Sequence, residues 1–163
     1  MPACRSTEVK PDARWNDGLS LADNVARALP SLARKWFEEG EKALQPGVTW
    51  DEMHQFRLLT KRFRYSLEIF VPLYGPSLAS RIEQLRKLQN LLGEINDCVT
   101  AQTLLGLDDT DGSLHRALTE RAEQKTNELR EYWAGTFSGK GPVEKWAGYL
   151  AKYVGRARRQ APR

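Results

Sequence analysis

The chain has 163 residues, a length that suits one domain with a sizeable hydrophobic core. Hydrophobic residues make up 40% of it and charged residues 28%, and the net charge of +4 is too small to indicate a nucleic-acid binder by itself. Cys4 and Cys98 fit no disulfide, redox or zinc pattern, and no apolar stretch approaches the ~20 residues that span a bilayer. Because the N-terminus also lacks the apolar core of a signal peptide, we expect a cytoplasmic protein.

Helical spacing of apolar residues begins after a polar N-terminal segment. Residues 1–17 are polar and are predicted to form a flexible tail. A first helix is expected from about Leu19 to Leu44, because apolar residues recur there at spacings of three and four. Pro30 falls inside this stretch and predicts a kink or a break in the helix.

The next two helices are marked by a cap and by proline and glycine. Thr49 and Glu52 fit a capping box, in which the threonine caps the helix and the glutamate reaches back to it. The second helix should therefore begin here and end near Phe70 or Tyr74, just before a Gly-Pro pair. A third helix is expected over about residues 77–105.

The C-terminal part of the chain predicts two more helices. An acidic turn over residues 106–112 leads to a fourth helix over 113–137, and a last short helix is expected over 142–157. Residues 158–163 form a basic tail, which leaves residues 18–157 as the helical domain. No segment alternates like a strand, so the predicted fold is all-α: an antiparallel four-helix up-down bundle with a short additional C-terminal helix.

The second helix carries its basic residues on one side. At ~100° per residue from His54, its apolar residues fall between about 140° and 220°, and four basic residues fall between about 280° and 360°. These four, which we call the basic ladder, are His54, Arg57, Lys61 and Arg64. Arg62 lies apart, near ~80°, and is expected to face another neighbour.

Two readings of the basic ladder remain open from the residues alone. Like charges three or four residues apart cost a few tenths of a kcal/mol per pair, and only Glu68 interrupts them with a negative charge. A solvated face, or partners from acidic residues on the first or fourth helix, would explain the ladder without a ligand. Alternatively, arginine forks, a lysine charge and a switchable histidine along ~15 Å of helix would suit a linear polyanion.

Three segments of the second and third helices carry a family resemblance. They are Met53-His54-Gln55-Phe56-Arg57, Lys61-Arg62-Phe63-Arg64-Tyr65-Ser66-Leu67-Glu68 and Leu85-Arg86-Lys87-Leu88-Gln89-Asn90-Leu91-Leu92-Gly93-Glu94-Ile95-Asn96-Asp97. In order and separation they resemble motifs of the CHAD domain family, the histidine α-helical domains. The resemblance covers about residues 50–105. Phe56 and Phe63 stand where the family motifs have aliphatic residues.

The resemblance implies an all-α fold whose basic surface binds inorganic polyphosphate. Carried over position by position, the implied ligand residues are His54, Arg57, Lys61, Arg64, Arg86 and Arg62, and more loosely Arg34 and Lys35. Gly93 matches a structural position and is expected to permit close helix approach. The usual family domain holds two such helical units and this chain holds one. We therefore hypothesise a homodimer formed through Trp146, Tyr149 and Tyr153 of the last helix.

The predicted function is non-catalytic binding of polyphosphate, with no catalytic residue, cofactor or metal ion. Binding should fall steeply with salt and strengthen as pH drops through about 6–7. The alternatives are an enzyme that processes polyphosphate or phosphoesters, or a nucleic-acid-binding protein that uses the same surface and the Arg156, Arg158 and Arg159 tail. Catalysis by His54 would need an orienting acceptor and a nucleophile or metal, which the sequence does not reveal. Trp50 is the tryptophan expected near the ligand.

Overall fold

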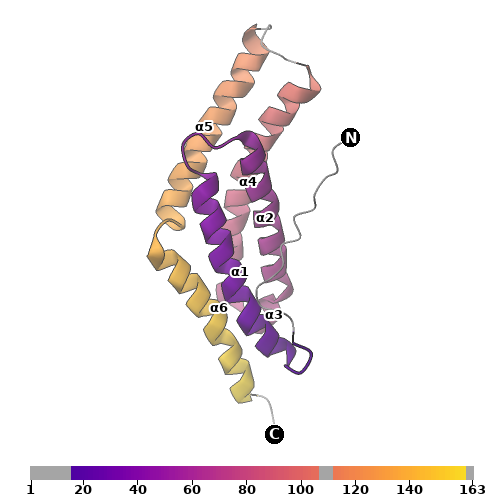
Figure 1. Cartoon of the computed structure of the whole chain (residues 1–163), viewed down its shortest axis with the longest axis vertical. Coiled ribbons are helices and arrows are strands. Elements are labelled where there is room, and N and C mark those ends of the chain that lie inside the picture. Colours follow the sequence, from indigo (N-terminus) through magenta and orange to yellow (C-terminus); the bar gives the residue numbers. More distant parts are fainter. Residues whose placement is uncertain (1–15, 107–111, 161–163) are drawn as a thin grey trace.

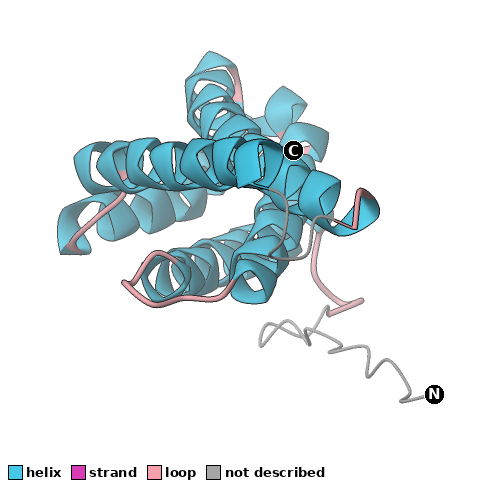
Figure 2. Cartoon of the chain, turned by 90° about the horizontal axis from the view of Figure 1, so that it is seen from above, coloured by secondary structure: helices cyan, strands magenta, loops and turns pink. Residues whose placement is uncertain are grey.

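The computed structural model describes residues 16–106 and 112–160, with the backbone alone for 152–160. Over these ranges the chain forms six α-helices and no strand, which confirms the all-α prediction (Figures 1 and 2). The helices are α1 (Leu21–Ala43), α2 (Trp50–Ile69), α3 (Val71–Tyr74), α4 (Pro76–Leu104), α5 (Gly112–Thr136) and α6 (Lys140–Gln160). None of these described helices is both long enough and apolar enough to cross a membrane.

Several predictions of local structure fall outside the described residues. These are most of the N-terminal tail, the acidic turn over 107–111 and the last three residues of the basic tail. The final helix is longer than predicted, since α6 begins at Lys140 and continues to Gln160. Within α1, the helix is continuous through Pro30, which is buried, so the predicted break does not occur.

The start of α2 is fixed by the predicted capping box. The Thr49 hydroxyl accepts a hydrogen bond from the Glu52 amide at 3.3 Å, and the Thr49 amide donates to the Glu52 carboxylate at 2.8 Å. The bond from the Thr49 backbone lowers the pKa of the Glu52 carboxyl below its usual value. These bonds satisfy backbone NH groups that the first turn of a helix would otherwise leave without partners. The cap therefore fixes where α2 begins, and with it the positions of the ladder residues along the helix.

Neighbouring helices run antiparallel. Colours along the chain show α1 rising, α2 descending, α4 rising and α5 descending, with α6 descending beside α1 (Figure 1). The chain reverses between α3 and α4 at Gly75, whose positive φ of 74° suits a residue without a side chain. The most extensive packing joins α4 to α5 and α1 to α6. The simple four-helix bundle with a small appended helix is therefore not confirmed, because α6 is a full partner of α1.

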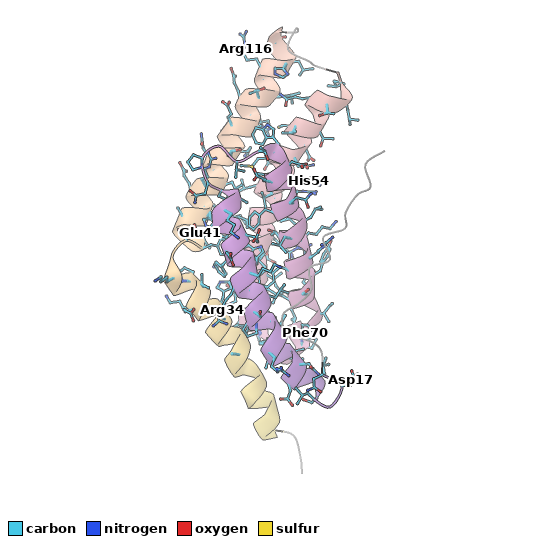
Figure 3. The ribbon with its side chains drawn as sticks, in the orientation of Figure 1. Asp17, Arg34, Glu41, His54, Phe70 and Arg116 are labelled. Carbon is cyan, nitrogen blue, oxygen red and sulfur yellow. The ribbon has the colours of Figure 1, made fainter. Side chains whose placement is uncertain are left out.

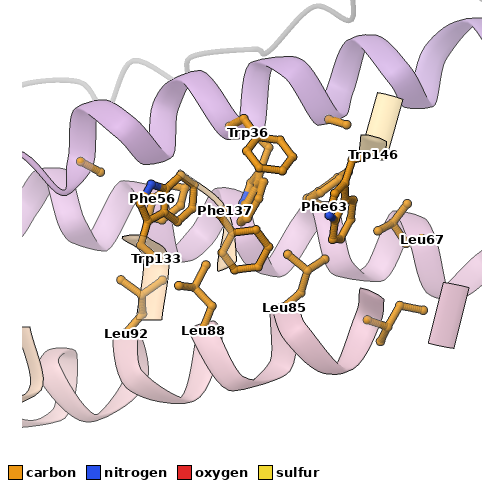
Figure 4. Packing of buried hydrophobic residues seen from close by; sticks show 14 of the residues in the cluster. Trp36, Phe56, Phe63, Leu67, Leu85, Leu88, Leu92, Trp133, Phe137 and Trp146 are labelled. Carbon is orange, nitrogen blue, oxygen red and sulfur yellow. The ribbon is translucent and has the colours of Figure 1, made fainter. Parts of the chain in front are cut away.

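The core is a hydrophobic cluster in which aromatic rings from α1, α2, α6 and the end of α5 pack against leucines of α4 (Figure 4). Trp36 of α1 lies at its centre, with its indole NH donating to the buried Thr60 hydroxyl of α2 at 3.0 Å. The rings around Trp36 are Phe37, Phe56, Phe63, Trp133, Phe137 and Trp146. Gly40 makes this packing possible, since a Cβ there would lie 2.1 Å from the Trp133 ring. The cluster holds α2 against α4 with the basic ladder on the outside.

Candidate functional site

His54 is held by α4. Its Nδ1 lies 2.7 Å from Oδ1 of Asn96, whose amide nitrogen lies 3.4 Å from the Thr100 hydroxyl. This arrangement orients the Asn96 oxygen toward the imidazole, so Nδ1 carries the proton and donates. The other ring nitrogen, Nε2, is left to face away from Asn96. It accepts hydrogen bonds when the ring is neutral and donates when the ring is charged.

Arg57 and Lys61 follow His54 along the face of α2. Arg57 is partly buried, and its Nε is shielded from solvent without a hydrogen-bond partner among the described residues. Lys61 is exposed, with its ammonium group 5.8 Å from the centre of the Tyr65 ring. Within the described part of the chain neither side chain forms an ion pair with a carboxylate. We call His54, Arg57 and Lys61 the open half of the ladder.

Arg64 differs from these three residues. Its side chain is only 11% exposed, its Nε donates to Gln89 of α4 at 2.8 Å, and its Nη1 pairs with Glu68. The same Glu68 oxygen lies 3.0 Å from Arg86 of α4, and Glu83 also pairs with Arg86. The bond from Glu68, with the nearby Glu83 charge, raises the pKa of Arg86. We call Arg64, Glu68 and Arg86 the clamped half of the ladder.

Three contacts set the register of α2 against α4. They are His54 with Asn96, Arg64 with Gln89, and Glu68 with Arg86. A Cβ built on Gly93 meets no atom within 4 Å, so the expectation that this glycine permits close helix approach is wrong.

The remaining predicted residues lie elsewhere. Arg62 lines a groove between α1 and α2 together with Lys35, on the side that its helical angle predicted. Arg34 lies beside α6, where it pairs with Glu144 at 3.6 Å, and it is well separated from His54 (Figure 3). The structure thus brings together the ladder and Arg86, but not Arg62, Lys35 and Arg34.

The sequence interpretation missed the polar residues of α4 that hold the ladder. Gln89 and Asn96 each bond a ladder residue, and they are seven residues apart, so they lie on one stripe of α4. That spacing was a signal that could have been used. The alternative explanation of the ladder placed its acidic partners on the first or fourth helix. The carboxylate that pairs with Arg64 is Glu68, one turn further along the same helix.

A groove continues from the open half past the first turn of α2. It has a volume of about 360 Å³, and its walls come from α2 and α4. His54 lines this groove as well as belonging to the ladder. Trp50 also lines the groove and is 40% exposed, and its expected nearness to the ligand stays a prediction.

Two of the three residues expected at a dimer interface make their contacts within the chain instead. Trp146 is buried within the aromatic cluster, and Tyr149 stacks on Arg81 and donates a hydrogen bond to the Tyr74 carbonyl at 3.3 Å. Both side chains are used within the chain because α6 packs along α1. Tyr153 lies beyond the residues whose side chains are described.

A family comparison fits this geometry. The model of the CHAD domain family matches residues 6–106. The chain belongs to the CHAD domain family. No curated protein and no solved structure is significantly similar to it. The matched region of this CHAD chain contains α1 to α4, and with them both halves of the ladder, whereas α5 and α6 follow it. The match begins before residue 18, where the helical domain was predicted to start.

Proposed function

We propose that this CHAD chain binds inorganic polyphosphate without transforming it, through the face that α2 and α4 form. The observation that carries the proposal is the state of Arg57. Its Nε is buried without a partner among the described residues, next to the exposed and unpaired Lys61. A buried donor without an acceptor costs about 1–3 kcal/mol, and an anionic oxygen would remove that cost.

Geometry favours a chain of phosphates over a single one. His54 to Lys61 extend over about 10 Å of helix, and no carboxylate of the described residues interrupts them. Guanidinium and ammonium groups at this spacing can each meet a different phosphate unit of one polymer. Because each contact also releases condensed counterions, affinity should fall steeply as salt is added.

The test is isothermal titration with polyphosphate of defined length at several salt concentrations. The Arg57→Ala/Lys61→Ala variant should lose at least about tenfold in affinity, and its salt dependence should become shallower by about one unit of slope per cation removed. The control is Arg116→Ala/Lys145→Ala, which removes the same charge from α5 and α6. Unchanged binding by the first variant, or equal losses in both, would contradict the assignment of the site.

Two assays separate this proposal from its alternatives. If RNA displaced polyphosphate at comparable phosphate concentration, the ladder would serve nucleic acids as well. If orthophosphate were released with magnesium and the release were lost in His54→Ala, the chain would be an enzyme. A homodimer that joins two such faces stays a prediction, which a monomer by light scattering at high protein concentration would contradict.

A further inference from the structure

The groove beside His54 is a feature that polyphosphate does not explain. Its floor is formed by the buried apolar side chains Met53, Leu92 and Ile95, and its rim carries Trp50 and Leu104, which are 40% and 80% exposed. Polyphosphate has no apolar surface to place there. Exposed apolar side chains, here Trp50 and Leu104, next to the cations of the open half of the ladder indicate a ligand that has a non-ionic part as well as a charged one.

The polar groups that line the groove indicate the chemistry of this non-ionic part of the ligand. Asn96, Thr100 and Thr103 of α4 lie along one wall, and Asp51 of α2 lies beside Trp50. Asn96 already bonds His54 and Thr100, and Thr103 donates to the Val99 carbonyl, so the wall offers a ligand only the remaining donor and acceptor capacity of these groups. A base and a ribose carry donors and acceptors that can use this capacity, whereas an acyl chain does not. The indole of Trp50 gives a flat face on which a base can stack.

Size and charge set the orientation of the ligand. A volume of about 360 Å³ lies at the lower end of the range for small-molecule pockets. It is too small for a partner helix, which is about 10 Å across. The Asp51 carboxylate would repel phosphate, and the cations begin at His54, so the phosphates extend from His54 toward Arg57 and Lys61.

We propose that the groove and the open half of the ladder together bind a nucleoside polyphosphate, with the base on Trp50 and the phosphates along the ladder. This inference rests on the proposed function, because it uses the same cations. It adds a ligand class that a bare phosphate chain does not represent. His54 is the residue shared by both parts, where the α-phosphate joins the nucleoside.

The experiment compares ATP with tripolyphosphate by isothermal titration in the same magnesium-free buffer. Tripolyphosphate carries the same three phosphates and at least as much negative charge, so charge alone would give it equal or tighter binding. Stacking and burial of the base should make ATP about tenfold tighter. In Trp50→Ala the affinity for ATP should fall to that for tripolyphosphate, which itself stays unchanged, while Trp50→Phe should keep part of the difference.

The control is Ile69→Ala, which removes another exposed apolar side chain at the far end of α2 and should leave both ligands unaffected. ATP binding no tighter than tripolyphosphate would overturn the inference and leave polyphosphate binding intact. An equal loss of both ligands in Trp50→Ala, or equal loss of ATP in the control, would also overturn it. If neither tripolyphosphate nor long polyphosphate bound, the proposed function itself would fail.

Discussion

The open half of the ladder and Arg64 of the clamped half share one stripe of α2, yet their surroundings differ. In the open half, Arg57 and Lys61 have no carboxylate partner among the described residues. In the clamped half, Arg64 is buried against Gln89 and shares Glu68 with Arg86. The difference teaches that a row of like charges on a helix is not uniform in role. Glu68 of α2 and Gln89 of α4 occupy Arg64, whereas no carboxylate of the described residues occupies Arg57 or Lys61, so these two cations remain free for a ligand.

The largest effect that we expect from the difference between the two halves is on the free energy of unfolding. Arg64→Ala should lower the free energy of unfolding by about 1–3 kcal/mol, because it leaves Gln89 and Glu68 without their shared partner. Arg57→Ala should not lower it by more than about 0.5 kcal/mol and should raise it if the lost packing is small, because the buried Nε that is removed has no partner among the described residues. Urea denaturation followed by circular dichroism measures both values.

Arg62→Ala is the matched control, since it removes an exposed arginine of the same helix that has no ion pair within the described residues. Its effect on stability should resemble that of Arg57→Ala. Equal destabilisation by Arg57→Ala and Arg64→Ala would remove the distinction between the open and clamped halves.

A smaller test concerns the charge of Glu68. In Glu68→Gln, the negative charge that neutralises Arg64 and Arg86 is lost and the side-chain size is kept, so the clamped half becomes available to phosphate. We expect polyphosphate affinity to rise about fivefold, the value of one unit charge at contact distance in water. Titration calorimetry at low salt measures the change.

Glu83→Gln is the control for that change. It removes the other carboxylate paired with Arg86, but Glu83 is exposed and does not contact Arg64, so a smaller gain is expected. If Glu68→Gln bound polyphosphate no better than the wild type, the polymer would not extend past Lys61. The comparison would then be sharpened, because the open half would hold the whole ligand.

The sequence predicted that the basic residues of α2 lie on one side of the helix, but it did not predict the difference between the open and the clamped half. The capping box and the 3.6-residue period place His54, Arg57, Lys61 and Arg64 on one side, because both are local properties of α2. The division depends on contacts between helices, in which Gln89 and Arg86 of α4 meet Arg64 and Glu68, and spacing along α2 alone does not reveal them. For the same reason the space around Gly93, where an added Cβ would meet no atom within 4 Å, and the burial of Trp146 could not be deduced from spacing.

The smallest expected effect lies at the upper end of the open half, where Asn96 holds the Nδ1 hydrogen of His54. Protonation at Nε2 turns an acceptor into a donor that faces the ligand, so phosphate binding favours the charged ring. Polyphosphate affinity should therefore rise about threefold as pH falls from about 8 to about 6.

Two substitutions distinguish the role of the His54 imidazole from that of Asn96, which orients it. His54→Gln should abolish the pH dependence, because glutamine does not titrate. Asn96→Ala should keep a weaker dependence, since the ring still titrates but is no longer held with Nε2 toward the ligand. A pH dependence that survives His54→Gln would place the titrating group elsewhere. The open half would then be a fixed array of two cations, and His54 would belong to the groove alone.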